Sequence, residues 1–376
     1  MRVCIVKNAE AENISDVYRI VSSLTEDGHE CIVLSRSRKN NTNRIQEKII
    51  YFDNKPIKFY EFNIKSDIGG GFKNIFNLNK YISTIRRWLE KNCDLYDVVH
   101  AFDLDCGLAS FIARRKTYKP YVYHISDFYV DSRSGIPKFL VNPIKNLEFK
   151  IINNSETTII CTEQRKEQIR NSNPKKLVVV HNTPAIDTKA IIIENGNKPL
   201  KLTYVGGLTD NRFIEEMVDI VKRDDNLHLT LAGTGPIKDY VQKASVKYKN
   251  IDYLGQVTYE DAIDIYKDCD IIFAIYNPVI KNHRYSAPNK FYEAMMLGKA
   301  LLVAKDTGVD KLVESEGMGL VVDYNKKSVE ENLNLLITNR QYLNDLKVKS
   351  KESYHKYSYN EMSKRIQNIY RNIIIN

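Results

Sequence analysis

Residues Tyr285–Ala304 have the sequence YSAPNKFYEAMMLGKALLVA and contain the clearest fold signal in the chain. The stretch passes from a polar turn with Pro288 through a predicted helix to Gly298, and then into a bare apolar strand. A helix that ends at glycine and is followed at once by a continuous apolar run is typical of α/β proteins, whose parallel strands are covered on both faces. One carboxylate, Glu293, lies within the helix, and the surrounding sequence gives it a role.

Around this stretch, short apolar segments alternate with longer amphipathic ones. The helix between the first two segments of this half places Ile214, Met217, Val218 and Val221 on one face. Several of the segments end at glycine, as tight turns between strand and helix do. The predicted strands of this half are contained in Lys201–Gly207, Leu227–Pro236, Ile251–Val257, Ile271–Pro278, Ala300–Ala304 and Gly319–Asp323.

The first half of the chain shows the same alternation. Its first two strands enclose a helix that Asp16 can cap and that Asp27-Gly28 ends, which makes one βαβ unit. The apolar segments are continuous rather than alternating, so they predict parallel strands buried on both faces. They are Arg2–Val6, Cys31–Ser35, Asp97–Ala101, Tyr121–Ile125, Thr157–Thr162 and Leu177–Asn182.

Two consecutive domains are expected for a chain of 376 residues. The segment Asn182–Pro199 contains two prolines and little periodicity, and it is interpreted as the connection between them. The last segment is another amphipathic helix. The predicted boundaries are 1–184 for an N-terminal domain, 185–355 for a C-terminal domain and 356–376 for a helix that packs back on the N-terminal domain.

Composition narrows the function classes. The net charge is +9, but the basic residues are dispersed, which favours a solvated Lys-rich surface over a nucleic-acid partner. The six cysteines show no metal-ligand spacing, and no apolar run is long enough to cross a bilayer. Acidic residues follow the first apolar segment closely, which argues against a secretory signal. A cytoplasmic protein is expected, and the basic surface leaves peripheral contact with the inner face of the membrane open.

Several kinds of chemistry are disfavoured. The segment after the first strand, KNAEAENISD, has no glycine, which excludes a dinucleotide fingerprint there. There is no G-x-S-x-G elbow. The pairs Asp103/Asp105 and Asp268/Asp270 match a D-x-D pattern that binds divalent cations in some transferases, but such pairs also occur by chance, and Asp268 and Asp270 end a helix and open a strand. No metal site is predicted. The sharpest polar cluster of the first half is YHISDFYVD, where His124, Ser126 and Asp127 end a strand; a functional role and ordinary capping are equally favoured.

The segments YVGGLTDNRFIEEMV, LTLAGTGP, IDYLGQVTYEDAIDIYKDCDIIFAIYNP and SAPNKFYEAMMLGKALLVAKDTGVDKLVESEGMGLVVD resemble, in order and spacing, the family-four (group 1) glycosyltransferases. The first half resembles the family more loosely, at DVYRIVSSLTEDGHECIVLS, YDVVHAFDLD and VVVHNTP. The resemblance implies the GT-B fold: two Rossmann-like β/α/β domains facing a central cleft, with a C-terminal helix crossing back to the N-terminal domain.

The resemblance also implies a donor site. Arg212 matches a basic residue that grips the donor diphosphate, and Glu293 matches the second acid of an E-x₇-E motif, which binds the ribose hydroxyls. Two positions depart from the family: Gly207 stands where an arginine is common, and Tyr285 stands in place of the first acid. The implied donor-binding residues are Gly206, Gly207, Arg212, Gly233, Thr234, Gly235, Gln256, Val257, Tyr285, Ser286, Ala287, Pro288, Asn289, Lys290 and Glu293.

The catalytic groups implied are Arg212 and Lys290, which would stabilise the leaving diphosphate, together with His124 and Asp127 near the acceptor. The acceptor side is predicted to contain Asn13, Asp103, Asp105 and Ser126.

The expected function is that of a retaining, metal-independent glycosyltransferase. It would move a sugar from a nucleotide-diphosphate sugar, as co-substrate with no other cofactor, to a hydroxyl of a glycan, lipid-linked or other acceptor, in surface polysaccharide or glycoconjugate biosynthesis. A GT-B sugar-nucleotide epimerase and a non-catalytic glycan-binding module remain alternatives.

Overall fold

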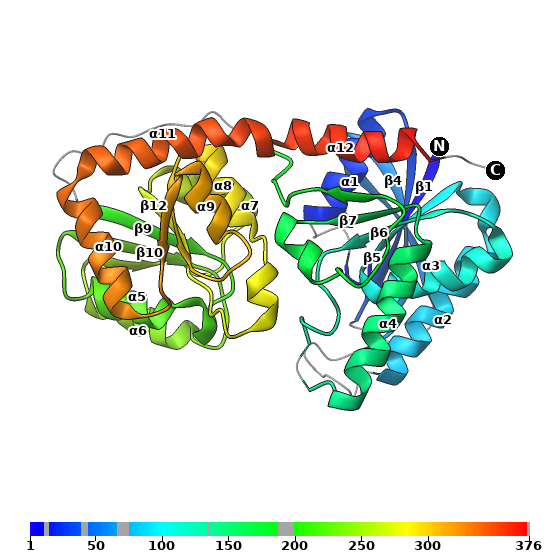
Figure 1. Ribbon diagram of the computed structural model, residues 1–376, viewed down its shortest axis with the longest axis horizontal. Coiled ribbons are helices and arrows are strands. Elements are labelled where there is room, and N and C mark those ends of the chain that lie inside the picture. Colours follow the sequence, from blue (N-terminus) through cyan, green and yellow to red (C-terminus); the bar gives the residue numbers. More distant parts are fainter. Residues whose placement is uncertain (11–14, 39–43, 66–74, 134, 187–198, 374–376) are drawn as a thin grey trace. The chain divides into compact units, whose positions relative to one another are not determined.

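A computed structural model describes residues 1–10, 15–38, 44–65, 75–133, 135–186 and 199–373. The chain divides into two compact units: unit 1 comprises Met1–His181 with Asn360–Asn376, and unit 2 comprises Asn182–Tyr359. Each unit is an α/β domain built on one sheet (Figure 1). No helix in the described ranges is long and apolar enough to cross a membrane.

Unit 1 contains an eight-stranded sheet in the order β3-β4-β2-β1-β5-β6-β7-β8. All neighbouring strands run parallel except β3 and β4, which pair antiparallel at one edge. The strands are β1 (Arg2–Val6), β2 (Glu30–Ser37), β3 (Ile45–Phe52), β4 (Lys55–Asn63), β5 (Val98–Phe102), β6 (Tyr121–Ile125), β7 (Thr157–Ile160) and β8 (Leu177–Val179).

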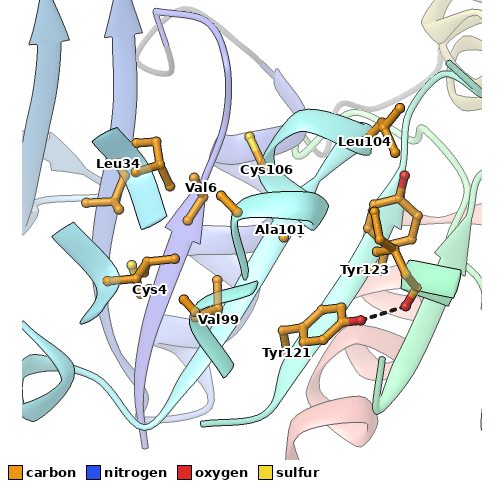
Figure 2. Packing of buried hydrophobic residues seen from close by; sticks show 14 of the residues in the cluster. Cys4, Val6, Leu34, Val99, Ala101, Leu104, Cys106, Tyr121 and Tyr123 are labelled. Carbon is orange, nitrogen blue, oxygen red and sulfur yellow. Dashed lines mark hydrogen bonds between the residues drawn. The ribbon is translucent and has the colours of Figure 1, made fainter. Parts of the chain in front are cut away.

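Helices cover both faces of this sheet. The helices are α1 (Ser15–Glu26), α2 (Ile75–Lys91), α3 (Asp103–Thr117), α4 (Lys138–Asn154) and α12 (Tyr359–Arg371). Apolar side chains of α2, α3 and α4 fill the core on one face, part of which Figure 2 shows around Val6, Ala101 and Cys106. The stripes of α1 and α12 fill the core on the other face. The last helix therefore returns to unit 1, because Met362, Ile366, Ile369 and Tyr370 are buried in that core.

The hairpin formed by β3 and β4 was not predicted from the sequence. Ile45, Ile49 and Tyr51 are exposed on β3, while β4 carries charged residues between its apolar ones. An edge strand with one solvent-exposed face lacks the continuous apolar run that marks the buried parallel strands. The six strands predicted in this half are all present.

Unit 2 contains a six-stranded, fully parallel sheet in the order β11-β10-β9-β12-β13-β14. All six strands predicted here are confirmed: β9 (Leu200–Val205), β10 (Leu227–Ala232), β11 (Ile251–Tyr253), β12 (Ile271–Ala274), β13 (Ala300–Ala304) and β14 (Gly319–Val322). The helices are α5 (Ile214–Val221), α6 (Lys238–Lys247), α7 (Tyr259–Lys267), α8 (Asn289–Leu297), α9 (Asp310–Glu316), α10 (Lys326–Thr338) and α11 (Arg340–Tyr357).

Each sheet contains a switch point, where the parallel strands on its two sides are added in opposite directions. In unit 1 the switch point lies between β1 and β5, and in unit 2 it lies between β9 and β12. The right-handed connections on the two sides of such a point place their helices on opposite faces of the sheet. The loops therefore diverge at the carboxyl ends of these strands and leave room for a ligand. These two positions are the first places to look for a site.

Candidate functional site

At the switch point of unit 2, two cations lie over two aromatic rings. Tyr204 is in β9, Tyr276 follows β12, and Lys290 is in the first turn of α8. The ammonium of Lys290 lies 3.4 Å from the ring centroid of Tyr204, and the guanidinium of Arg212 lies 3.7 Å from that of Tyr276. Lys290 also lies 5.9 Å from the Tyr276 ring centroid, so both cations share one aromatic floor. The structure thus brings together the two residues predicted to hold the diphosphate.

The electrostatics of this pair favour an anionic ligand. Lys290 is 7% exposed, and burial, followed by the charge of Arg212, lowers the pKa of its ammonium well below the ordinary value. Neither cation makes an ion pair with a described acidic residue. A buried ammonium beside a guanidinium loses hydration and suffers repulsion, and a bound diphosphate would reverse both effects.

Glu293 lies one turn further along α8 and is 4% exposed. One of its carboxylate oxygens accepts a hydrogen bond of 3.1 Å from the hydroxyl of Tyr259. Burial raises the pKa of Glu293 to about 7, against the opposing effects of Tyr259 and Lys290. A buried carboxyl with one hydrogen-bond donor retains acceptor capacity, which suits a ligand that presents hydroxyls.

Two glycines allow the backbone turns at this edge to approach one another. Gly233 has φ of 128°, and a Cβ there would lie 1.9 Å from the carbonyl oxygen of Gly206. Gly235 has φ of 159°, and a Cβ there would lie 2.2 Å from the carbonyl oxygen of Leu208. The loops after β9 and β10 therefore pack in a manner that no other residue type permits.

The turn before α8 is held by the buried His283. Its ring bonds to the carbonyl of Asn277 at 2.9 Å, and its own carbonyl accepts hydrogen bonds from the hydroxyl (3.0 Å) and the amide (3.3 Å) of Ser286. Burial, followed by Arg212, lowers the pKa of His283. Sequence reasoning missed this residue, and its position just before the turn was the only available signal.

The remaining residues of the turn lie between His283 and α8. Tyr285 and Ser286 are partly exposed, and the carbonyl of the buried Ala287 accepts a bond of 2.9 Å from the side-chain amide of Asn182. Pro288 precedes the first residue of α8, Asn289.

The other predicted donor residues lie on neighbouring loops. The carbonyl of Gly207 accepts a bond of 2.9 Å from the hydroxyl of Tyr204, and the carbonyl of Thr234 accepts one of 3.0 Å from the amide of Leu208. Gln256 is exposed and Val257 half-buried on the loop after β11, where no described contact joins them to the cations.

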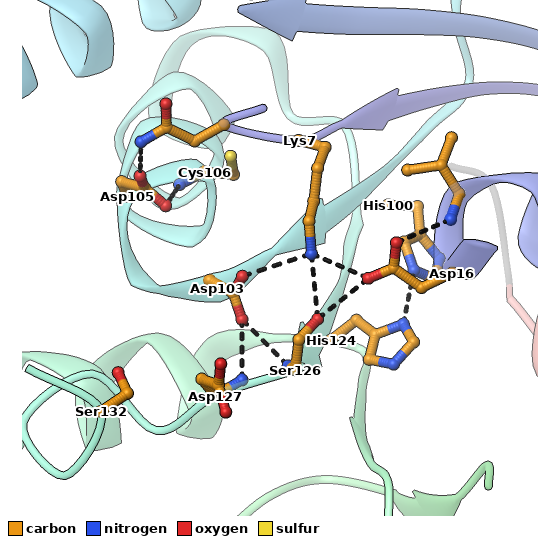
Figure 3. Close-up of polar contacts among 12 residues, drawn as sticks. Lys7, Asp16, His100, Asp103, Asp105, Cys106, His124, Ser126, Asp127 and Ser132 are labelled. Atoms are coloured by element: carbon orange, nitrogen blue, oxygen red, sulfur yellow. Dashed lines mark hydrogen bonds and ion pairs between the residues drawn. The ribbon is translucent and has the colours of Figure 1, made fainter. Parts of the chain in front are cut away.

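Unit 1 carries a second polar cluster at its own switch point (Figure 3). Lys7 follows β1, and its ammonium lies 2.8 Å from a carboxylate oxygen of Asp16, 3.1 Å from the hydroxyl of Ser126 and 3.4 Å from Asp103. Asp103 also accepts bonds from the amides of Ser126 (2.9 Å) and Asp127 (3.2 Å). The predicted residues Asp103, Ser126 and Asp127 are thus brought together, and Lys7 at their centre was not predicted.

In this cluster, burial disfavours the charged forms of Lys7 and Asp103, and the attraction between the opposite charges favours them. Burial would lower the pKa of Lys7, but Asp103 and then Asp16 raise it above its ordinary value. Burial raises the pKa of Asp103 despite the nearby Lys7. Asp103 also adopts φ of 59°, a left-handed conformation that is uncommon for residues other than glycine. Such backbone strain is concentrated at functional sites.

The other residues predicted for the acceptor side have different surroundings. The side chain of Asp127 is about half exposed, and its carboxylate lies 3.4 Å from the buried guanidinium of Arg165. Asp105 is buried and accepts a hydrogen bond from the side-chain amide of Asn8. Asn13 lies outside the described residues.

His124 is enclosed within unit 1. Its ring is 1% exposed, stacks on Phe102 with centroids 4.5 Å apart, and bonds to His100 at 3.1 Å; His100 in turn bonds to the hydroxyl of Tyr370 at 2.6 Å. Burial lowers the pKa of His100 to about 3 and that of His124 well below its ordinary value. This neutral network ties α12 to the sheet, and direct catalysis by His124 stays a prediction.

Within the described ranges, no group of three His, Cys, Asp or Glu side chains converges as metal ligands do. Asp103 turns to Lys7 and Asp105 to Asn8, so this pair does not point at a common centre. Asp270 pairs with Lys347 at 2.5 Å in the interior of unit 2, as expected of a structural role.

Two family models match the chain. Residues 16–188 match "Glycosyltransferase Family 4", and residues 199–339 match "Glycosyl transferases group 1". No curated protein matches the sequence.

Solved structures share the fold at low identity. Sucrose-phosphate synthase from Thermosynechococcus elongatus superposes with a TM-score of 0.76 at 13% identity, covering 99% of this chain and 98% of that one. HepE from Anabaena in complex with UDP and glucose gives 0.69 at 13% identity, covering 99% and 100%. A glycosyltransferase from Rickettsia africae gives 0.67 at 14% identity, covering 99% of each chain.

Proposed function

The chain belongs to the family-four (group 1) glycosyltransferases with the GT-B fold, and from that premise we propose that it is a retaining enzyme. It transfers a sugar from a nucleotide-diphosphate sugar to a hydroxyl of a glycan or lipid-linked acceptor. The product belongs to a surface polysaccharide or another glycoconjugate. Peripheral contact of the basic surface with an anionic membrane would fit a lipid-linked acceptor.

One observation carries the donor assignment: Arg212, Lys290 and Glu293 are gathered at the switch point of unit 2, on loops that glycines allow to pack closely. Two adjacent cations match the charge of a diphosphate, and the buried carboxylate matches two neighbouring ribose hydroxyls. Glu293 lies one turn from Lys290 on the same helix, which suits a ligand whose phosphate adjoins its ribose. HepE, a structural neighbour, is described in complex with UDP-glucose.

The proposed chemistry uses this chain's own charges. As the bond between the sugar and the diphosphate breaks, negative charge grows on the departing phosphate oxygen. Arg212 and Lys290 stabilise that charge, and a bound diphosphate raises the pKa of Lys290 back toward its ordinary value, so the ammonium is charged when it is needed. We propose that this replaces a divalent cation, so transfer is metal-independent.

The acceptor is assigned to the polar cluster of unit 1. Asp127 presents a partly exposed carboxylate beside Ser126, while Lys7 and Asp103 hold the loop that carries both. A retaining enzyme of this family delivers the acceptor hydroxyl on the face that the diphosphate leaves. The departing phosphate can then take the hydroxyl proton, and Asp127 orients the acceptor rather than acting as a strong base.

The test begins with a thermal-shift screen against nucleotide sugars, because a ligand at 100 times its Kd stabilises a protein by about 2.7 kcal/mol. The donor that binds is then incubated with glycan and lipid-linked acceptors, with EDTA and without. We expect transfer in EDTA and, by NMR, a product with the anomeric configuration of the donor. Lys290→Gln should lower nucleotide release strongly, whereas the exposed Lys311→Gln should not.

Three results would contradict the proposal. Loss of transfer in EDTA that Mg²⁺ restores would remove metal independence, and an inverted product would remove the retaining mechanism. Release of an epimerised free sugar without acceptor would instead identify an epimerase. No response to any nucleotide sugar would favour a binding module with a degenerate donor site.

A further inference from the structure

A basic groove in unit 1 has no lining residue in common with the polar cluster around Lys7. It runs between the carboxyl end of β4 and the segment of α2 from Asn79 to Arg87, and its volume is about 510 Å³. Pockets that bind small molecules in other proteins have volumes of roughly 300–1,000 Å³. Phe62, which is 2% exposed, contributes an apolar floor.

Three cationic side chains line the groove: Arg44, Lys80 and Arg87. None of them forms an ion pair with a described residue, and no described acidic side chain lines the groove. On the same helix Arg86, which does not line the groove, lies 3.7 Å from Glu90. Of the cations on α2, Lys80 and Arg87 therefore line the groove, whereas Arg86 and Lys91 do not.

Helical spacing explains this concentration. Lys80, Ser83 and Arg87 are three and four residues apart, which places them in a row on one face of α2. The hydroxyl of Ser83 has no hydrogen-bond partner among the described residues, so it can serve a ligand. The opposite face of the helix carries Tyr81 and Ile85 into the core, so the row is held rigidly.

Guanidinium, ammonium and hydroxyl groups around one hollow are the donors that bind phosphate oxygens. A carbohydrate without charge would leave three cations uncompensated, whereas a phosphate group would neutralise them. The groove lies at the carboxyl edge of the same sheet as the Lys7 cluster, because β4, β2, β1 and β5 run parallel.

We propose that this groove binds a phosphate group of the acceptor, which makes the acceptor a phosphate-bearing molecule. The phosphate is either that of a lipid headgroup or that of a soluble phosphorylated sugar or polyol. The identification of the ligand as acceptor rests on the proposed function, while phosphate binding by the groove does not.

The chain contains a natural reporter for this binding. Trp88 is its single tryptophan and follows Arg87 in α2. Its ring packs on Tyr60 of β4 with centroids 4.8 Å apart, between the two elements that form the groove. Its fluorescence is measured while the full chain is titrated with glycerol 3-phosphate, and separately with vesicles of phosphatidylglycerol or of phosphatidylcholine. Unit 2 contains no tryptophan of its own.

We expect a saturable change with at least one phosphate probe, and an affinity at least about tenfold lower in Lys80→Gln/Arg87→Gln, because charge-assisted hydrogen bonds are lost. Lys91→Gln/Arg115→Gln removes the same charges from unit 1 outside the groove and should retain the parental affinity. A response to glycerol 3-phosphate alone identifies a soluble source, and a response to phosphatidylglycerol but not phosphatidylcholine identifies a lipid.

The inference is overturned if no probe gives a saturable change, or if both double variants lose affinity equally, since that would reflect net charge alone. The titration contains no donor, so its outcome is separate from donor binding. A chain that binds a nucleotide sugar but no phosphate probe at Trp88 loses this inference and keeps the proposed function. A chain that binds a phosphate probe but no nucleotide sugar keeps phosphate binding by the groove and loses the proposed function.

Discussion

Replacing Glu293 by glutamine tests the donor site most directly. The carboxylate is 4% exposed and bonds to Tyr259 at 3.1 Å. If it accepts both ribose hydroxyls, each hydrogen bond contributes about 1.5–3 kcal/mol. Glutamine keeps the side-chain volume and one acceptor oxygen, so at least one of these bonds is lost or weakened. Affinity for the nucleoside diphosphate should fall at least about tenfold, which is about 1.4 kcal/mol.

The pH dependence of binding sharpens this test. Because the pKa of Glu293 is about 7 in the free protein, its carboxylate fraction falls about tenfold between pH 8 and pH 6. Lys290 takes up a proton as pH falls, which strengthens binding of the diphosphate and so opposes the effect of Glu293 on total affinity. The comparison of a nucleoside diphosphate with its 2′,3′-dideoxy analogue cancels that effect, since both ligands carry the diphosphate. The preference for the ribose ligand should therefore decrease toward pH 6 in the parent and stay constant in Glu293→Gln.

Stability distinguishes a binding role from a structural one. The pKa of Glu293 in the folded chain lies above its ordinary value of 4.5, so its contribution to stability is fully present below pH 4.5 and is lost as pH rises through 7. Glu293→Gln should accordingly melt at the parental temperature or higher at pH 8 without ligand. Isothermal titration calorimetry and thermal unfolding measure both quantities. An equal loss of affinity for the ribose and dideoxy ligands, or no loss for either, would refute the assignment.

Three further predictions concern other parts of the molecule. Asp103→Asn should lower transfer to an acceptor, measured as kcat, and leave donor affinity unchanged in calorimetry; an equal loss of donor affinity would mean that it supports folding instead. Gly233→Ala should destabilise unit 2 by more than about 2 kcal/mol in urea unfolding, because its Cβ would lie 1.9 Å from a carbonyl oxygen. Gly255→Ala, at φ of 72° with no atom within 4 Å of the added Cβ, should cost only about 1 kcal/mol. Similar losses of stability in the two variants would contradict this reasoning. Burial raises the pKa of Glu148 to about 8, so its contribution to stability is lost as pH rises from 4.5 through 8. Glu148→Gln should flatten that decline in the free energy of unfolding by a few kcal/mol, at ~1.36 kcal/mol per pH unit. An unchanged pH profile of unfolding would show that Glu148 is not the group responsible.

Much of the fold was determined by local sequence pattern. Continuous apolar runs separated by amphipathic helices specify parallel strands covered on both faces, and twelve such segments appear as strands in the two sheets. The family motifs placed Arg212, Lys290 and Glu293 in one stretch of chain and its neighbouring loops, so their proximity could be predicted. Their proximity followed from the resemblance, and it agrees with a doubly wound sheet, in which the carboxyl ends of successive strands meet at one edge.

Other features depend on contacts between residues far apart in sequence. Nothing local to Lys7 indicates that its ammonium lies between Asp16, Ser126 and Asp103, since these contacts exist only once β1, β5 and β6 lie side by side. The exposed antiparallel edge at β3 was missed because a strand with one solvated face lacks the continuous apolar signal.

The direction in which a side chain points was also decided by tertiary structure. His124 and Ser126 are two residues apart near the end of one strand, yet the ring of His124 is enclosed with His100 and Tyr370 while Ser126 reaches the cluster around Lys7. The sequence by itself determined that polar groups end this strand. Only the packing of α12 against the sheet determined that the histidine is covered. Helix and strand are more than two hundred residues apart, as His100 and Tyr370 are 270 residues apart, so the sequence of one segment does not indicate its contact with the other.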